Sequence, residues 1–268
     1  MFEKVSLRKK MENGKVVFGS YLQTKDPSIV EIMGLIGFDF VIVDMEHTTP
    51  SAMVPDSIIR AGEIANISVI IRVPEDYSTI LQVLEFGADG IILPHVKTKE
   101  AAQELVNRAK YYPIGSRGMS GSARSAKYSI EDFKEHMQRC NEDIIVCAMI
   151  EDKKAVDNIE EIISVKGLDM IFIGPSDLSE SLGVPSEVYS NIVHESIDKI
   201  INAVQQRNKK YQTKKDSIKV GFPAYTVTEI PGILEKKINM ITSPSNDLSF
   251  LTNQLKIHME KIKEYTNK

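Results

Sequence analysis

Short apolar segments recur along the chain, and polar segments with helical spacing lie between them. Each apolar segment is continuous rather than alternating, which is typical of a strand buried on both faces of a parallel sheet. Eight such strands are predicted, at residues 16–22, 40–45, 68–73, 90–96, 144–150, 170–175, 219–225 and 238–244.

The polar segments predict helices at residues 26–37, 76–87, 98–112 and 152–167, a long helix near 186–210, and an amphipathic helix over 247–265. Asp26 followed by Pro27 is a typical helix start, and Gly37, Gly87 and Gly167 stand where a helix commonly ends. Strands that alternate with helices indicate a parallel sheet with right-handed crossovers.

Eight strand–helix units in about 250 residues match the size of a (β/α)8 barrel. We therefore predict an α/β protein, a single (β/α)8 TIM barrel domain over residues 1–268. An open doubly wound sheet is the alternative, but no GxGxxG follows the first strand to support a dinucleotide-binding fold.

The composition of the chain argues against nucleic-acid-binding and membrane-binding functions. The net charge is −4, and Lys and Glu are mixed along the chain, so we expect no nucleic-acid partner and no polybasic membrane contact. No run of 18 apolar residues is present, so we expect no membrane-spanning helix, and residues 1–15 contain no apolar stretch, so we expect no signal peptide. The two cysteines, Cys140 and Cys147, are interpreted as reduced thiols, and the expected location is the cytoplasm.

Candidate catalytic and metal-binding residues follow the predicted strands. In a (β/α)8 barrel the residues at the C-terminal ends of the strands face the active site. Polar residues follow five consecutive strands: Asp44, Glu46 and His47, then Arg72, then His95, then Glu151, then Ser176 and Asp177. Scattered surface charge would not produce this pattern.

Glu151 and Asp177 are the candidate metal ligands. Neighbouring strands would bring the two carboxylates together, and like charges at short range raise a pKa or recruit a cation. Oxygen ligands without a Cys or His cluster favour Mg²⁺ or Mn²⁺ over zinc. The alternative is that both acids form ion pairs, or that Asp177 caps the following helical turn.

Arg72, His47 and Asp44 are the candidate catalytic residues. The guanidinium of Arg72 offers a planar fork for a carboxylate or a developing enolate oxygen, and the alternative is a structural salt bridge with Asp44 or Glu46. His47 could act as a general base oriented by Asp44, or be an ordinary loop histidine. His95 could face the substrate or belong to the core.

Several motifs together carry a resemblance to a known family, in collinear order from about residue 14 to residue 251. They are GFDFVIVDMEHTTP at 37–50, IRVP at 71–74, LEFGADGIILPHVKTKEAA at 84–102, YYPIGSRG at 111–118, IEDKKAVDNIEEI at 150–162 and IFIGPSDLSESLG at 171–183. The chain resembles the HpcH/HpaI aldolases, which are metal-dependent class II pyruvate aldolases on a (β/α)8 barrel.

The resemblance implies a role for each matching residue. Glu151 and Asp177 would bind a divalent metal that chelates a pyruvate-like 2-oxo acid. Arg72 would stabilise the enolate oxygen, and the Asp44–His47 pair would move protons through a water. The implied substrate-binding residues are Arg72, His95, Met149, Gly174, Pro175 and Ser176.

The resemblance also implies an activity and an assembly. The activity is retro-aldol cleavage of a 4-hydroxy-2-oxo acid to pyruvate and an aldehyde, through a metal-bound enolate. The assembly is a homo-oligomer, typically a hexamer, with the helix at 247–265 packed on a neighbouring subunit.

Four positions depart from the family pattern. Met149 stands where Gln is usual, His95 where Met is usual, Tyr21 close to where Trp is usual, and Glu85 where Asp is usual. The metal and enolate residues are kept while their surroundings change. Two alternatives therefore stay open: a condensing member, a citrate synthase that joins oxaloacetate and acetyl-CoA in siderophore biosynthesis, and a non-catalytic 2-oxo acid binding protein.

Overall fold

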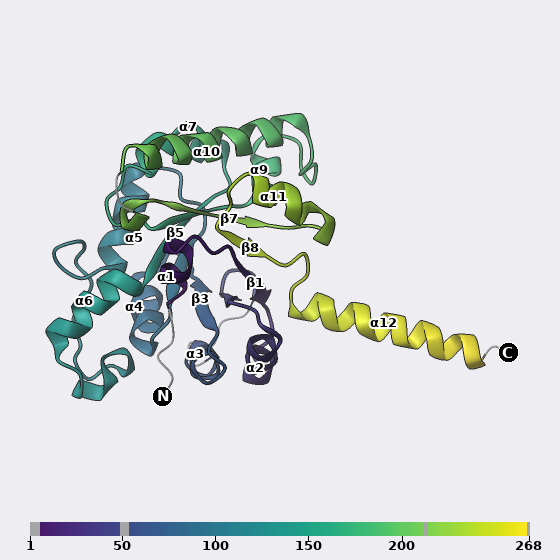
Figure 1. Ribbon diagram of the computed structural model, residues 1–268, viewed down its shortest axis with the longest axis horizontal. Coiled ribbons are helices and arrows are strands. Elements are labelled where there is room, and N and C mark those ends of the chain that lie inside the picture. Colours follow the sequence, from purple (N-terminus) through teal and green to yellow (C-terminus); the bar gives the residue numbers. More distant parts are fainter. Residues whose placement is uncertain (1–5, 49–53, 212–213, 267–268) are drawn as a thin grey trace.

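The computed structural model describes residues 6–48, 54–211 and 214–266. The ends of the predicted domain, residues 1–5 and 267–268, and two internal segments, 49–53 and 212–213, lie outside this description. Eight parallel strands form a closed barrel in sequence order, with helices around it (Figure 1). The strands are β1 Val17–Leu22, β2 Phe40–Asp44, β3 Ser68–Arg72, β4 Gly90–Leu93, β5 Ile145–Ile150, β6 Met170–Ile173, β7 Lys219–Pro223 and β8 Met240–Thr242.

The predicted (β/α)8 barrel is confirmed. The alternative of an open sheet is wrong, because β1 pairs with β8 in parallel, with Val17 opposite Met240 and Gly19 opposite Thr242.

The helices are α1 Leu7–Glu12, α2 Pro27–Ile36, α3 Val54–Ile64, α4 Tyr77–Phe86, α5 Lys99–Ala109, α6 Phe133–Asp143, α7 Lys153–Asp157, α8 Ile159–Ile162, α9 Pro175–Ser181, α10 Asn191–Lys209, α11 Ile230–Glu235 and α12 Asp247–Thr266, with 3₁₀ turns η1 Arg124–Ser129, η2 Lys214–Asp216 and η3 Val227–Glu229.

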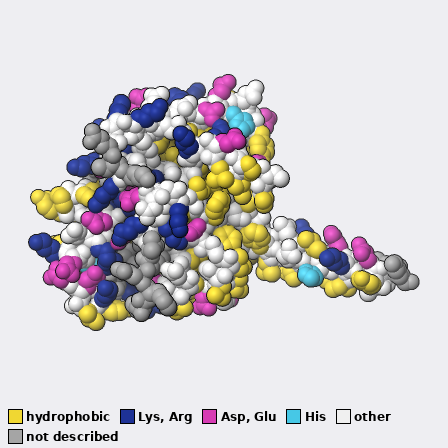
Figure 2. Space-filling model, in the orientation of Figure 1, with side chains coloured by type: hydrophobic (Ala, Val, Ile, Leu, Met, Phe, Trp, Pro, Cys, Tyr) yellow, Lys and Arg dark blue, Asp and Glu magenta, His cyan; other side chains and the backbone are white. Residues whose placement is uncertain are grey.

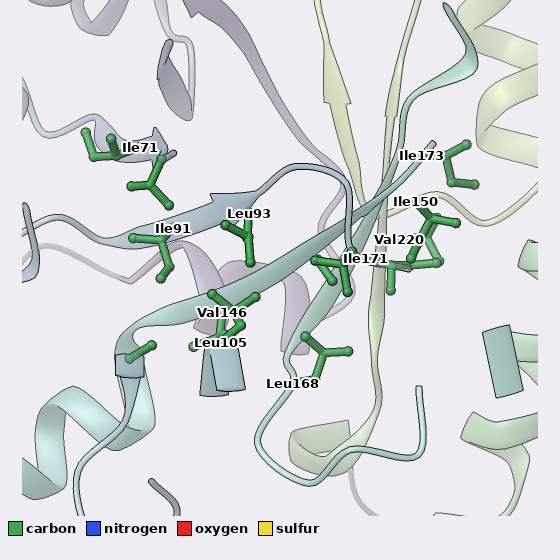
Figure 3. Packing of buried hydrophobic residues seen from close by; sticks show 14 of the residues in the cluster. Ile71, Ile91, Leu93, Leu105, Val146, Ile150, Leu168, Ile171, Ile173 and Val220 are labelled. Carbon is green, nitrogen blue, oxygen red and sulfur yellow. The ribbon is translucent and has the colours of Figure 1, made fainter. Parts of the chain in front are cut away.

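Two apolar layers lie on either side of the sheet. The outer layer packs strand residues such as Ile71, Val146 and Ile171 against the helices (Figure 3). The inner layer fills the barrel, where the large rings of Phe40 and Phe172 need space. A methyl group at Gly19 would lie 2.4 Å from the Phe40 ring, so this glycine lets the barrel interior close around that ring.

One helix prediction is wrong in part. A single helix was expected over 152–167, but α7 and α8 are separate and meet at Asn158, where φ is −95° and ψ is 11°. The Asn158 side chain donates a hydrogen bond to the backbone oxygen of Lys97 (2.9 Å), and this tertiary contact holds the break. The long helix near 186–210 is confirmed as α10, which begins at Asn191.

The amphipathic helix predicted over 247–265 is confirmed as α12, and it extends away from the barrel (Figure 1). Its first residue anchors it, because the Asp247 carboxylate accepts the backbone N–H groups of Gln23 (2.8 Å) and Thr24 (2.9 Å). Large apolar side chains are exposed along the arm (Figure 2): Leu248, Phe250, Leu251, Leu255, Ile257, Met259, Ile262 and Tyr265. Within the described ranges, no helix is long and apolar enough to cross a membrane.

Candidate active site

A buried ion pair joins the ends of β2 and β3. Asp44 and Arg72 are direct partners in the register of these strands. Arg72 Nε and Nη2 donate to Asp44 Oδ1 (3.0 Å) and Oδ2 (2.6 Å), a bidentate arrangement. Burial would raise the pKa of Asp44, but the hydrogen bonds and charge of Arg72 outweigh it and lower that pKa below 3.8. Both partners are therefore charged at neutral pH.

Glu46, in the loop after β2, continues the contacts from Arg72. Arg72 Nη1 lies 3.1 Å from Glu46 Oε2, and His95 Nε2 lies 3.1 Å from Glu46 Oε1. The other ring nitrogen, His95 Nδ1, lies 3.0 Å from Glu151 Oε1. The side chains that follow β2, β3, β4 and β5 thus form one continuous chain of polar contacts.

Glu151 is the buried acid of the site. It follows β5 directly, and its carboxylate accepts the backbone N–H of His95 at 2.7 Å. Burial raises the pKa of Glu151 to about 7, the His95 backbone N–H and ring oppose that rise, and the negative charge of Asp177 adds to it. A cation bound between Glu151 and Asp177 would stabilise the ionised form of both acids, so this pair is suited to binding one.

The turn after β6 places the second acid. Helix α9 begins at Pro175, and Asp177 lies in its first turn. Gly174 is the N-cap, so the alternative that Asp177 caps this helix is wrong. A methyl group at Gly174 would lie 2.8 Å from Glu151 Oε2, which shows that the absent side chain makes room for the Glu151 carboxylate.

His47 and Asp44 do not meet as the sequence suggested. Asp44 Oδ1 accepts the backbone N–H of His47 (3.3 Å), while the His47 ring lies 3.8 Å from the Glu46 carboxylate. The reason is that Arg72 occupies both Asp44 oxygens. A water-mediated link between the Asp44 and His47 side chains stays a prediction. The salt bridge considered as the alternative for Arg72 is present, and it involves both Asp44 and Glu46.

The remaining predicted substrate-binding residues fall in two places. Ser176 is exposed, and its hydroxyl lies 2.9 Å from that of Tyr225. Met149 is buried in the inner core, next to Phe172 in the strand register. Pro175 is buried in the first turn of α9.

Sequence reasoning missed Tyr225, and it gave Glu46 only the alternative role of a salt-bridge partner for Arg72. Tyr225 follows β7, so applying the strand-end rule to the seventh strand would have found it. Its backbone N–H donates to Glu229 Oε2 (2.8 Å), and its ring packs edge-on against Tyr189, with the ring centroids 6.1 Å apart. The contact of Glu46 with His95 was not anticipated, because it depends on how the loops after β2 and β4 fold.

The strand ends, the acid pair and the arginine follow the pattern of one enzyme family. The model of the HpcH/HpaI aldolase/citrate lyase family matches residues 17–213. The chain belongs to this family. The resemblance inferred from the motifs is therefore confirmed, and the protein is an enzyme of the aldolase and lyase type.

Named relatives cover most of the chain. The 2-keto-3-deoxy-L-rhamnonate aldolase of Escherichia coli K12 is 32% identical over 202 residues, 75% of this chain and 73% of that protein. The HpcH/HpaI aldolase of Desulfitobacterium hafniense DCB-2 is 30% identical, with a TM-score of 0.88 and 97% of each chain covered. The citrate synthase SbnG is 29% identical, with a TM-score of 0.86, and the match covers 98% of this chain and 99% of that one.

Proposed function

We propose that this member of the HpcH/HpaI family cleaves a 4-hydroxy-2-oxo acid to pyruvate and an aldehyde, with the aid of a divalent metal. The observation that carries the proposal is the buried Glu151 carboxylate, whose pKa is raised to about 7 beside Asp177. It lies at the end of a contact chain that leads through His95 and Glu46 to Arg72.

The charge balance of the site fits a divalent cation. Asp44 and Glu46 share the guanidinium of Arg72, whereas Glu151 is raised in pKa by its burial and by the nearby charges of Asp177 and Glu46. Glu151 and Asp177 would hold the metal, and oxygen ligands of this kind suit Mg²⁺ or Mn²⁺. Among the described residues no group of three or more His, Cys, Asp or Glu is arranged for a metal, so substrate and water would complete the ligand set. When bound, the cation polarises the 2-oxo group of the substrate.

The residues of the chain then have defined tasks. Two hydrogen bonds to Asp44 use two of the five N–H donors of Arg72, and Nη1 lies 3.1 Å from Glu46. The remaining donors can stabilise negative charge on the enolate oxygen. The exposed His47 would take the proton of the 4-hydroxyl group as the C3–C4 bond breaks. The electron pair of that bond goes to the enolate, the aldehyde leaves, and protonation at C3 gives pyruvate.

A condensing reaction is the second candidate. Similarity to the citrate synthase SbnG over 98% of the chain favours it, at nearly the same identity as the aldolases. In this case the substrates would be oxaloacetate and acetyl-CoA, and the enolate would form on the acetyl group. His95 bridges Glu46 and Glu151 at a position where the aldolases usually have Met, and this change of pocket is compatible with another second substrate.

A paired assay tests the proposal. Protein stripped of metal and reloaded with Mg²⁺ or Mn²⁺ is given a panel of 4-hydroxy-2-oxo acids, with pyruvate release as the readout. A second reaction follows thiol release from acetyl-CoA with oxaloacetate. Metal-dependent pyruvate release supports the aldolase, and thiol release alone supports the condensing enzyme. Binding of pyruvate without deuterium exchange at its methyl group, and without either reaction, would indicate a non-catalytic 2-oxo acid binding protein.

We also infer a homo-oligomer, a hexamer by family resemblance, in which α12 packs on a neighbouring subunit. The exposed apolar side chains along the arm, including Leu251 and Leu255, support this inference because they would be covered in an assembly. A cytoplasmic location is part of the same proposal. The free and buried thiols of Cys140 and Cys147 support it, since reducing compartments keep thiols unpaired.

A further inference from the structure

We infer that Glu46 is a positioning residue of this site, which fixes the Arg72 guanidinium and the His95 imidazole relative to each other. The inference rests on the proposed function for its kinetic consequences, but its structural basis is independent of the substrate. One carboxylate contacts three cationic or potentially cationic side chains: Arg72 at 3.1 Å, His95 at 3.1 Å and His47 at 3.8 Å.

Glu46 contacts the edge of the Arg72 guanidinium that Asp44 does not bind. Asp44 binds one edge of the group, through Nε and Nη2. This fork leaves Nη1 without an anchor from Asp44, and Glu46 Oε2 supplies that anchor. A planar guanidinium held on two edges presents its remaining N–H donors in a fixed direction, which is what stabilisation of a developing oxyanion requires.

The contact with His95 secures an uncommon backbone conformation. His95 has φ of +55°, in the left-handed region that side chains other than glycine seldom adopt. Glu151 Oε1 holds the residue on one side, through the backbone N–H and ring Nδ1, and Glu46 holds ring Nε2 on the other. Without Glu46 the exposed ring would keep only one of its two carboxylate partners.

Glu46 is itself well fixed and partly shielded from water. Its backbone N–H donates to Asp44 Oδ1 at 3.0 Å, so the loop begins in a defined direction. Its side chain is 19% exposed, against 59% for His47 and 58% for His95. Solvent therefore screens the contacts of Glu46 less than those of a surface carboxylate.

The experiment compares Glu46→Gln with the wild type and with a matched control, Glu75→Gln. Glu75 is exposed in the loop after β3, so its variant removes the same charge from the same end of the barrel. The carboxamide keeps only one acceptor oxygen and has no charge, so it cannot accept from both Arg72 and His95 as the two carboxylate oxygens can. We expect Glu46→Gln to lower kcat by about 10-fold or more with KM for the 2-oxo acid changed less than about 3-fold, because the loss falls on the transition state. Glu75→Gln should match the wild type, and equal effects of the two variants would overturn the inference.

Double-mutant cycles test whether Glu46 acts by positioning Arg72 and His95 or acts independently of them. Glu46→Gln is combined with Arg72→Lys and, separately, with His95→Ala. If Glu46 acts through these residues, each double variant loses less activity than the product of the two single losses. Losses that simply multiply in both cycles would show that Glu46 acts by itself, and the inference would be wrong.

A spectroscopic readout keeps the test informative if neither substrate panel reacts. The His95 ring signals in ¹H–¹⁵N NMR spectra, assigned with the His95→Ala variant, are compared in the wild type, Glu46→Gln and Glu75→Gln at one pH. A shift in Glu46→Gln alone supports the positioning contact even if the proposed reaction is not observed. Unchanged His95 signals in Glu46→Gln would refute the contact even in an active enzyme.

Discussion

Replacing Glu151 by Gln should make the metal-free protein more stable at pH 8, although it removes a proposed metal ligand. The ionised carboxylate is unfavourable where it stands, because burial raises its pKa from 4.5 to about 7. Gln has nearly the same shape, its amide oxygen can still accept the backbone N–H of His95, and it does not ionise.

The magnitude follows from the two pKa values. Each pKa unit corresponds to about 1.4 kcal/mol, so the step from 4.5 to about 7 amounts to about 3 kcal/mol. Below pH 4.5 the carboxyl group is protonated in both the folded and unfolded states, and burial of Glu151 does not reduce the free energy of unfolding. As the pH rises from 4.5 to 7, the unfolded state releases its proton first and stability falls. Above pH 7 the wild type has lost the full amount of stability, about 3 kcal/mol, whereas Glu151→Gln has lost none of it.

Thermal unfolding with a chelator, at fixed protein concentration, measures this difference. The gain in the variant should be below about 1 kcal/mol at pH 5 and about 3 kcal/mol at pH 8, or roughly 5–10 °C in Tm at the higher pH. Added Mg²⁺ or Mn²⁺ should stabilise the wild type and leave the variant unchanged. A variant that is no more stable than the wild type at pH 8 would refute the reasoning that burial dominates the energetics of Glu151.

Three further predictions concern other parts of the molecule. Arg72→Lys keeps the charge but loses the planar fork, so kcat should fall by about 10²-fold or more in steady-state assays; near-normal turnover would leave Arg72 a structural role. Gly174→Ala should push the Glu151 carboxylate aside and weaken metal binding in calorimetry, whereas Gly232→Ala, with open space around the added methyl group, should not. Leu255→Lys on α12 should shift the protein to smaller species in sedimentation experiments, and an unchanged mass would contradict the proposed role of this arm.

Most of the fold could be predicted because each strand is a continuous apolar run and each crossover has a helical pattern. The strand-end rule then identified Asp44, Arg72, His95, Glu151 and Asp177 as neighbours, since parallel strands all end on the same side of a barrel. This part of the site follows from chain direction alone.

The sequence offered two partners for Asp44, His47 and Arg72, and it could not decide between them, because the pairing depends on register and loop geometry. Asp44 was expected to orient His47, three residues along the chain, but it faces Arg72 in the strand register. Similarly, nothing local in the sequence shows that the Asn158 side chain would bond to Lys97 and break a helix. Both cases are tertiary contacts that outweigh a local pattern.

The register between Asp44 and Arg72 has a consequence for how this enzyme could change its substrate. Asp44 and Arg72 are strand residues opposite each other in the sheet, so the barrel fixes the backbone positions from which their side chains pair. Tyr225, by contrast, stands in the loop beyond the end of β7, and loops tolerate changes of length and composition better than strands do. The residue proposed to stabilise the enolate is thus placed by the barrel itself, and we expect changes of the second substrate to arise mainly from changes in the loops.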